Sequence, residues 1–130
     1  MFDNYVLLQD GFRNVKRGDK ITGFEVQTFI SYYRGIPISM INTFEIAVDG
    51  KKVPQENIWF SPDGEHYFTL QEMTTVTSYK WEYGEPGHVY VEQPGGLEPG
   101  EHEVSLMESI RISYIPVPFV GRSTKRLWLA

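Results

Sequence analysis

The sequence predicts an all-β protein, folded most simply as a two-sheet antiparallel β-sandwich of about eight strands. Three observations support this prediction. Short segments alternate apolar and polar residues with a period of two, turn-forming glycines and prolines separate these segments, and no ten-residue stretch has the apolar spacing of an amphipathic helix. The pattern leaves a jelly-roll and an immunoglobulin-like strand order both open.

The alternating segments predict strands that each turn one face toward the core. In the first of them, Phe24 and Val26 face the core, whereas Glu25 and Gln27 face solvent. The same alternation recurs, more weakly toward the C-terminus, in residues 43–49, 77–83, 88–93, 101–106 and 110–114.

The segments between these strands contain residues that favour turns, because glycine readily adopts a positive φ and proline fixes φ near the value that a turn needs. Asp49 and Gly50 form a two-residue combination that favours a tight hairpin. The other turn signals are residues 17–19, 34–37, 62–64, 84–87, 93–96 and 98–100.

The composition indicates one soluble, cytoplasmic domain that spans residues 1–130. A chain of this length can bury a core without disulfides, and it contains no cysteine. Its formal net charge of −5 and its scattered basic residues argue against nucleic-acid binding. Residues 1–12 lack the features of a signal peptide, and no apolar run reaches the length of a membrane helix. We therefore expect neither a nucleic-acid nor a membrane partner.

No arrangement of polar residues predicts a catalytic or metal site in this chain. His66, His88 and His102 are too far apart in sequence for a metal-binding motif, and we expect them at exposed strand ends. Glu101 and Glu103 alternate with apolar residues, which predicts a solvated strand face rather than the acid pair of a glycosidase. No serine lies in a G-x-S-x-G motif, and no glycine-rich loop precedes a helix.

Aromatic residues make up 15% of the chain and leave two functions open. Carbohydrate-binding sandwiches expose flat aromatic rings that stack on sugars, and Trp59 and Trp81 are the candidates for such a surface. Protein interfaces use the same amphipathic rings as anchors. Trp81 shares one strand face with Tyr79 and Tyr83, and an inward stripe of these three residues in the core is the simpler interpretation.

The segment ISYIPVPFVGR, residues 112–122, breaks the alternation of the strand that precedes it. From Ile115 onward the formerly outward face is apolar, and two prolines on the other face exclude a central strand because they donate no ladder hydrogen bond. We expect an extended segment at a sheet edge, covered by the protein's own loop or by a partner. The candidate interface residues here are Ile115, Pro116, Val117, Pro118, Phe119 and Arg122.

A second candidate interface lies in YYRGIPIS, residues 32–39. Tyrosine and arginine are among the residue types that most often anchor interfaces. The alternative is a packed connection between strands, with the arginine reaching into water. The candidate residues are Tyr32, Tyr33, Arg34 and Pro37.

Taken together, several segments resemble the small β subunit of bacterial C-glycoside deglycosidases. The segments are residues 22–39, 45–58, 81–87 and 96–119. They contain the motifs Y-Y-R-G, D-G-x-x-V-P, L-x-P-G-x-H-x-V and R-I-S-Y. The turn and hairpin motifs recur in many β-sandwiches, so the combination, which covers most of the chain, is what points to this family.

The resemblance implies a hetero-oligomeric enzyme in which this chain is a non-catalytic partner. In that family a TIM-barrel α subunit holds a divalent metal, typically manganese, and supplies the catalytic base. The substrate is a C-glycoside, such as a flavonoid C-glycoside, whose sugar is already in the 3-keto form. The keto group acidifies the C2 proton, so that a lyase-type elimination breaks the bond between sugar C1 and the aglycone. We expect no cofactor and no catalytic residue in this chain.

Overall fold

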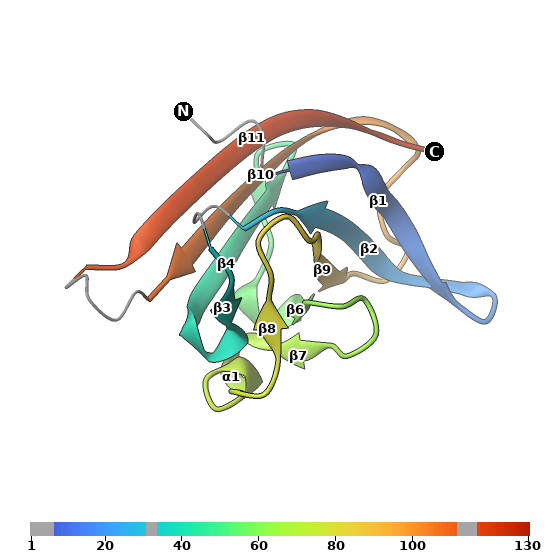
Figure 1. Ribbon diagram of the computed structural model, residues 1–130. Helices are drawn as coiled ribbons and strands as arrows, with labels where there is room; N and C mark the ends of the chain where they lie inside the picture. The colour runs from blue at the N-terminus through green and yellow to red at the C-terminus, as the bar shows by residue number, and fades with distance from the viewer. Residues whose placement is uncertain (1–6, 31–33, 112–116) are drawn as a thin grey trace.

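The computed structural model describes residues 7–30, 34–111 and 117–130, and these residues form an all-β sandwich (Figure 1). The five-stranded sheet has the order β1 (Leu7–Arg17), β2 (Lys20–Thr28), β9 (Gly87–Glu92), β6 (Ile58–Ser61) and β7 (Phe68–Thr69). The four-stranded sheet has the order β11 (Phe119–Leu129), β10 (Gly100–Ile110), β4 (Ile41–Val48) and β5 (Lys51–Lys52). A small third sheet pairs β3 (Ile36–Pro37) with β8 (Lys80–Trp81).

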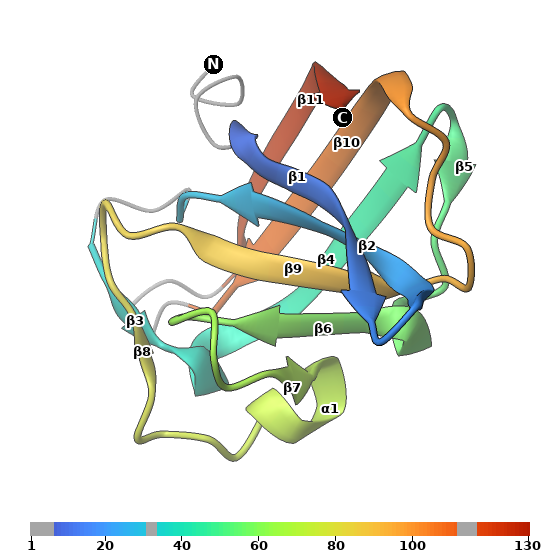
Figure 2. The same cartoon turned by 90° about the vertical axis from the view of Figure 1, so that its right-hand side faces the viewer.

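All of these strand pairs are antiparallel, which confirms the predicted architecture. Figure 2 shows the two larger sheets as two layers whose strands cross each other. The described residues also contain two short 3-10 helices (Ile38–Met40 and Gln55–Asn57) and one short α-helix, α1 (Leu70–Met73). The α-helix begins with a capping box between Thr69 and Glu72. None of their helices is long and apolar enough to span a membrane.

The described residues form eleven strands, three more than the sequence analysis counted. Four of the eleven, β3, β5, β7 and β8, are two residues long. Alternation could not reveal β3, β5 and β7, whereas β8 is the short remainder of the strand predicted over residues 77–83. No strand was predicted over β1 or over the last residues of the chain, and these two largest omissions are each eleven residues long. The second of them is β11. Its inward face includes Ser123 and its outward face includes Trp128, so its apolar alternation is blurred.

The core lies between the inner faces of the two larger sheets, where the predicted inward residues of β2, β4 and β10 are buried. Phe44, Phe60 and Trp81 form an aromatic cluster, with ring centroids 5.0 Å apart for Phe44 and Phe60 and 4.8 Å apart for Phe60 and Trp81. Trp81 is fully buried, and its indole N–H donates to the Glu85 carbonyl over 3.1 Å. The prediction that Trp81 lies in the core is confirmed, and its alternative role in sugar stacking is wrong because the ring is buried. Of the tyrosines predicted on the same inward stripe, Tyr79 packs against the core, but Tyr83 is 64% exposed because the strand ends at Trp81.

The hairpin predicted at Asp49 and Gly50 joins β4 to β5. The two turn residues have φ values of 52° and 83°, and positive φ at both central positions is the requirement of a type I′ turn. Asp49 also contacts the next strand of the sheet, since its Oδ1 accepts from the Glu103 backbone N–H and its Oδ2 lies 2.7 Å from His102 Nδ1. The turn is therefore fastened to the start of β10.

Candidate functional site

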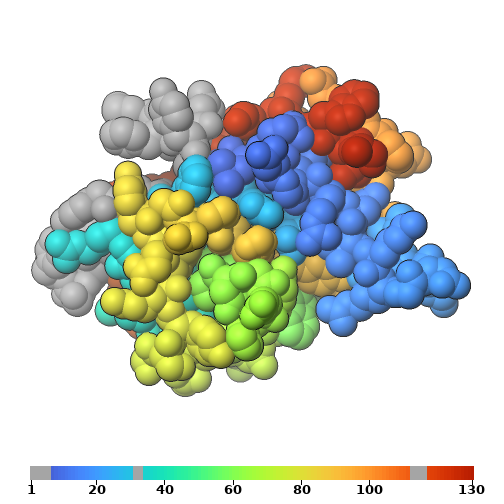
Figure 3. Space-filling model, turned by 45° about the vertical axis from the view of Figure 1, so that its right-hand side comes forward, coloured from blue at the N-terminus to red at the C-terminus, as the bar shows by residue number. Residues whose placement is uncertain are grey.

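A pocket of about 370 Å³ opens on the outer face of the five-stranded sheet, which is within the usual size range of ligand pockets (about 300–1,000 Å³). Its aromatic lining consists of Trp59, Tyr67 and Tyr90. Figure 3 shows this side of the molecule, where the blue β1–β2 hairpin lies beside the green segment that contains β6 and β7. This pocket is the candidate functional site.

The register of the sheet assembles the site from four neighbouring strands. Arg13 of β1 lies opposite Glu25 of β2, Glu25 lies opposite Tyr90 of β9, and Tyr90 lies opposite Trp59 of β6. These residues form one row across the outer face, although they are far apart in the sequence. Such cross-strand neighbours lie within side-chain contact distance.

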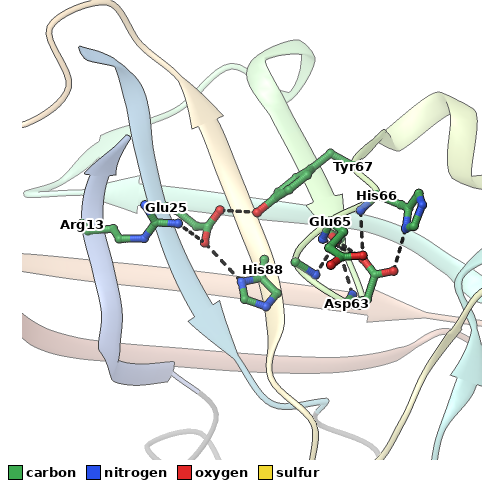
Figure 4. A network of polar contacts seen from close by, with 9 residues as sticks. Arg13, Glu25, Asp63, Glu65, His66, Tyr67 and His88 are labelled. Atoms are coloured by element: carbon green, nitrogen blue, oxygen red, sulfur yellow. Dashed lines mark hydrogen bonds and ion pairs between the residues drawn. The ribbon is translucent and has the colours of Figure 1, made fainter. Parts of the chain in front are cut away.

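Glu25 is the centre of a polar network at one end of this row (Figure 4). Its Oε1 accepts a hydrogen bond of 2.6 Å from the Tyr67 hydroxyl. Its Oε2 lies 3.3 Å from the Arg13 guanidinium and 3.2 Å from Nδ1 of His88. Because a carboxylate only accepts hydrogen bonds, His88 Nδ1 carries a proton in this contact.

The structure corrects the prediction that Glu25 faces solvent. Glu25 does point away from the core, but it is only 2% exposed, because Tyr67 from the segment before β7 covers it. His88 of β9 flanks the same carboxylate. Alternation predicted the face correctly and could not reveal that another part of the chain covers that face.

The network fixes the protonation states of Glu25 and Tyr67. Burial alone would raise the pKa of Glu25, but hydrogen bonds from His88 and Tyr67 and the charge of Arg13 bring it below its ordinary value of 4.5. Burial, and then the bond to Glu25, raise the pKa of Tyr67 well above its ordinary 10.0. At neutral pH Glu25 is a buried anion and Tyr67 a neutral phenol, so this pair is a fixed structural element rather than an acid and base ready to exchange a proton.

The pocket lining also carries polar side-chain groups that the described residues leave unused. Arg17 and Glu92 are exposed lining residues, and neither side chain makes a hydrogen bond or ion pair with any residue the structure describes. The Trp59 indole N–H likewise has no hydrogen-bond partner within the described ranges. The neighbouring Tyr90 hydroxyl, in contrast, donates to Thr22 Oγ1 over 2.8 Å, which fixes its ring in place.

Those predicted interface residues that the structure describes lie elsewhere, near one end of the four-stranded sheet. Tyr32, Tyr33, Ile115 and Pro116 fall outside the described residues. Arg34, Val117, Pro118 and Arg122 are exposed, and Pro37 of β3 is half-buried. Phe119 differs from these, because it is half-buried and packs against the core.

Backbone pairing brings the two predicted interface segments to the same end of the molecule. Ile110 at the end of β10 pairs with Phe119 on one side and with Ile41 on the other. Arg111 then bonds Met40 through its backbone N–H and Ser39 through its guanidinium, over 2.7 Å and 3.2 Å. Residues 36–41 and 117–122 are thus joined through residues 110 and 111.

Asp63, Glu65 and His66 form the one group in the described ranges whose side chains lie close enough to share a metal ion. The Asp63 carboxylate already accepts hydrogen bonds from other residues of its own turn. Its Oδ1 accepts from the backbone N–H groups of Glu65 and His66, and its Oδ2 lies 2.8 Å from His66 Nδ1. All three residues are exposed, so the group is better explained as a turn-stabilising motif.

His66 is exposed, as the sequence analysis predicted, but the other two histidines are not. His88 belongs to the Glu25 network, and the imidazole of His102 lies between Asp49 and the Glu98 carbonyl. Glu101 and Glu103 are exposed, which confirms the predicted solvated face.

Comparison with known proteins identifies relatives of this chain. The family model described as C-glycoside deglycosidase beta subunit matches residues 2–114. A C-glycoside deglycosidase beta subunit from Eubacterium cellulosolvens (strain ATCC 43171 / JCM 9499 / 6) is 36% identical over 115 residues, which cover 88% of this chain and 78% of that protein. Both matches confirm the resemblance found in the sequence.

Proposed function

Because the chain belongs to the family of C-glycoside deglycosidase β subunits, we propose that it is the non-catalytic subunit of a hetero-oligomeric C–C lyase. The family match carries this proposal, since a β subunit implies a partner subunit. The Glu25 network supports it as well. The best-formed ionisable cluster on this outer face is buried and saturated with hydrogen bonds, and a catalytic base must be free to reach its substrate.

The reaction is proposed to take place in a TIM-barrel α subunit. A base of that subunit removes the C2 proton of a 3-keto-C-glycoside, a C1–C2 double bond forms, and the bond between C1 and the aglycone breaks with its electron pair on the aglycone carbon, which is then protonated. A divalent metal held by that subunit, manganese in this proposal, would supply Lewis-acid chemistry to the keto group. The aglycone is proposed to be a flavonoid, and the present chain shapes and stabilises the complex.

The α subunit is proposed to dock at the end of the four-stranded sheet that contains Val117 and Val120. These apolar side chains are 64% and 48% exposed. β11 is an edge strand, and edges of this kind are ready to pair with another chain. The end that includes Val117 and Val120 is continuous with residues 36–41, which adds the second predicted segment to the same surface.

The backbone of β11 favours the same docking site. Trp128 uses both its N–H and its C=O to bond the side chain of Gln9, over 2.8 Å and 2.9 Å, so its backbone groups point away from β10. Because alternate residues of a strand point the same way, the backbone groups of Val120, Arg122 and Thr124 also face outward. Those groups bond to none of the described residues, so this part of the edge can accept a strand or loop of the α subunit.

The test of docking replaces both exposed valines, in the variant Val117→Asp/Val120→Asp. We expect this variant to lose co-elution with the α subunit on size exclusion, because it places two charges on the proposed contact, while circular dichroism shows an intact sandwich. Phe119 is unsuitable for this test, since it packs against the core.

Trp128→Asp is the matched control, because Trp128 is an exposed apolar residue (61%) at the other end of the same strand. It should leave assembly unchanged. If the double variant co-elutes as well as the unmodified chain, the docking surface lies elsewhere.

A further inference from the structure

We propose that the pocket on the outer face of the five-stranded sheet binds a neutral pyranose ring, so that this subunit has a sugar site of its own. The proposal goes beyond the role of a docking subunit and does not depend on where the α subunit binds. It rests on the geometry of Trp59, Tyr90, Arg17 and Glu92 in a pocket of about 370 Å³.

The first support is that hydrogen bonds and ring contacts hold the walls of the pocket in place. The Glu25 network locks Tyr67 against the sheet, and the Tyr67 and Tyr90 rings meet edge to face with centroids 6.4 Å apart. Tyr90 is held in turn by its bond to Thr22. A preorganised wall of this kind lowers the entropy cost of binding a ligand.

The second support is a set of polar groups in the pocket lining that form no hydrogen bond with the described residues. The Trp59 indole N–H and the Arg17 guanidinium are donors, and the Glu92 carboxylate is an acceptor, and the described residues engage none of them. A sugar hydroxyl both donates and accepts, so a single ring can bond to Arg17 and Glu92 at once. The C–H face of the ring can meanwhile lie against the aromatic wall.

Other ligand classes fit these groups less well. An anion would face the carboxylates of Glu25 and Glu92, and the guanidinium of Arg13 is already paired with Glu25. A bare aromatic aglycone could stack on Trp59, but it would remove Arg17 and Glu92 from water without replacing their hydrogen bonds, which costs binding free energy. A neutral, polyhydroxylated ring satisfies both the apolar and the polar lining.

The test is a titration of the full chain with glucose, a flavonoid C-glucoside and the aglycone alone, followed by ¹H–¹⁵N NMR. The chain has three tryptophans, so three indole N–H signals are expected. We expect saturable shifts of the Trp59 signal with glucose and with the C-glucoside, at a dissociation constant on the order of 1 mM, because one ring buries little surface. The signals of Trp81, which is buried, and of Trp128, which does not line the pocket, should not move.

Variants then locate the site. Glu92→Gln should weaken sugar binding about tenfold, because it replaces a charged acceptor, whereas Glu103→Gln, at an exposed glutamate on the other sheet, should not. Trp59→Leu should abolish the binding and Trp128→Leu should leave it intact. Glu92 is exposed, so its variant remains informative even if Trp59→Leu fails to fold.

Three results would overturn the proposal: no saturable shift with either sugar, binding of the aglycone but not of glucose, or equal binding by Glu92→Gln and the unmodified chain. Co-elution of Glu92→Gln with the α subunit is measured in parallel. We expect it to be unchanged, so that failure of the sugar site and failure of the docking proposal can be told apart.

Discussion

Tyr67 shows how a single hydroxyl holds the outer face of the five-stranded sheet together. It donates to a carboxylate that is almost inaccessible to water, and the bond is 2.6 Å long. Removing this donor leaves one oxygen of Glu25 without its shortest hydrogen bond. Hydrogen bonds to charged groups contribute more than neutral ones, because the buried charge has no water to replace the lost partner.

We therefore predict that Tyr67→Phe lowers the free energy of unfolding by about 1.5–3 kcal/mol. The pKa of Glu25 is lowered in the folded protein, so its contribution to stability is present above 4.5 and is lost as the pH falls through the folded value. In the variant that loss should begin at a higher pH. Urea unfolding measured over a series of acidic pH values checks both expectations.

Tyr90→Phe provides the matched control for Tyr67→Phe. Its hydroxyl donates to the neutral Thr22 hydroxyl, so its removal should cost less, about 0.5–1.5 kcal/mol, and should not change the acid dependence. If the two variants lowered the free energy of unfolding equally, the result would contradict the claim that the buried charge of Glu25 strengthens the Tyr67 hydrogen bond.

Residue-level patterns predicted the core of this protein better than its candidate site. Phe24, Phe44 and Ile46 are buried, as their alternation predicted. Glu25 was assigned to the correct face but to the wrong environment, since alternation reports only the direction of a side chain. The partners Tyr67 and His88 come from other parts of the chain, and only strand register and the course of the segment before β7 bring them to Glu25.

At the scale of elements, a histidine clamp joins the β4–β5 hairpin to β10. His102 Nδ1 lies 2.7 Å from the Asp49 carboxylate, and its Nε2 lies 2.6 Å from the Glu98 carbonyl. Both contacts are satisfied when both ring nitrogens carry protons. Accordingly the Glu98 carbonyl and the Asp49 carboxylate raise the pKa of His102 above its ordinary 6.5.

We predict that this clamp stabilises the protein at low pH and weakens as the pH rises. A raised folded pKa gives a contribution that is complete below 6.5 and is lost as the pH rises through the folded value. Mainly through its bond to His102, Asp49 has a pKa below 3.8, so it stays ionised across this range.

The measurement is the difference in unfolding free energy between the unmodified chain and His102→Gln. This difference should shrink as the pH rises above 6.5, and the titration of other groups cancels from it. A difference that is independent of pH would show that His102 is not protonated in the folded state.

The β11 edge explains why part of the fold could not be predicted from the sequence. Its inward positions Ser123, Leu127 and Leu129 are buried, but a serine inside and a tryptophan outside make the pattern look irregular. The sequence did predict an edge position for residues 112–122, and Phe119 and Arg122 do lie in an edge strand. That prediction rested on the two prolines, which donate no ladder hydrogen bond. The pairing of β11 with β10 along its full length depends instead on contacts between residues remote in sequence.

At the scale of the whole molecule, the two proposed surfaces lie on different sheets. The sugar pocket is on the outer face of the five-stranded sheet, and the docking surface is at the end of the four-stranded sheet. The core lies between the two sheets, so the two surfaces share no residue. This arrangement suits a subunit that holds an α subunit on one side and a glycoside ring on the other.

Reconstitution of the enzyme from separate subunits tests the central claim most directly. The isolated chain, the α subunit, and a mixture of the two are each supplied with a 3-keto-C-glycoside, and release of the aglycone is followed by chromatography. We predict no release by this chain alone and full release by the mixture. Full turnover by the isolated chain would contradict the assignment of this protein as a non-catalytic β subunit.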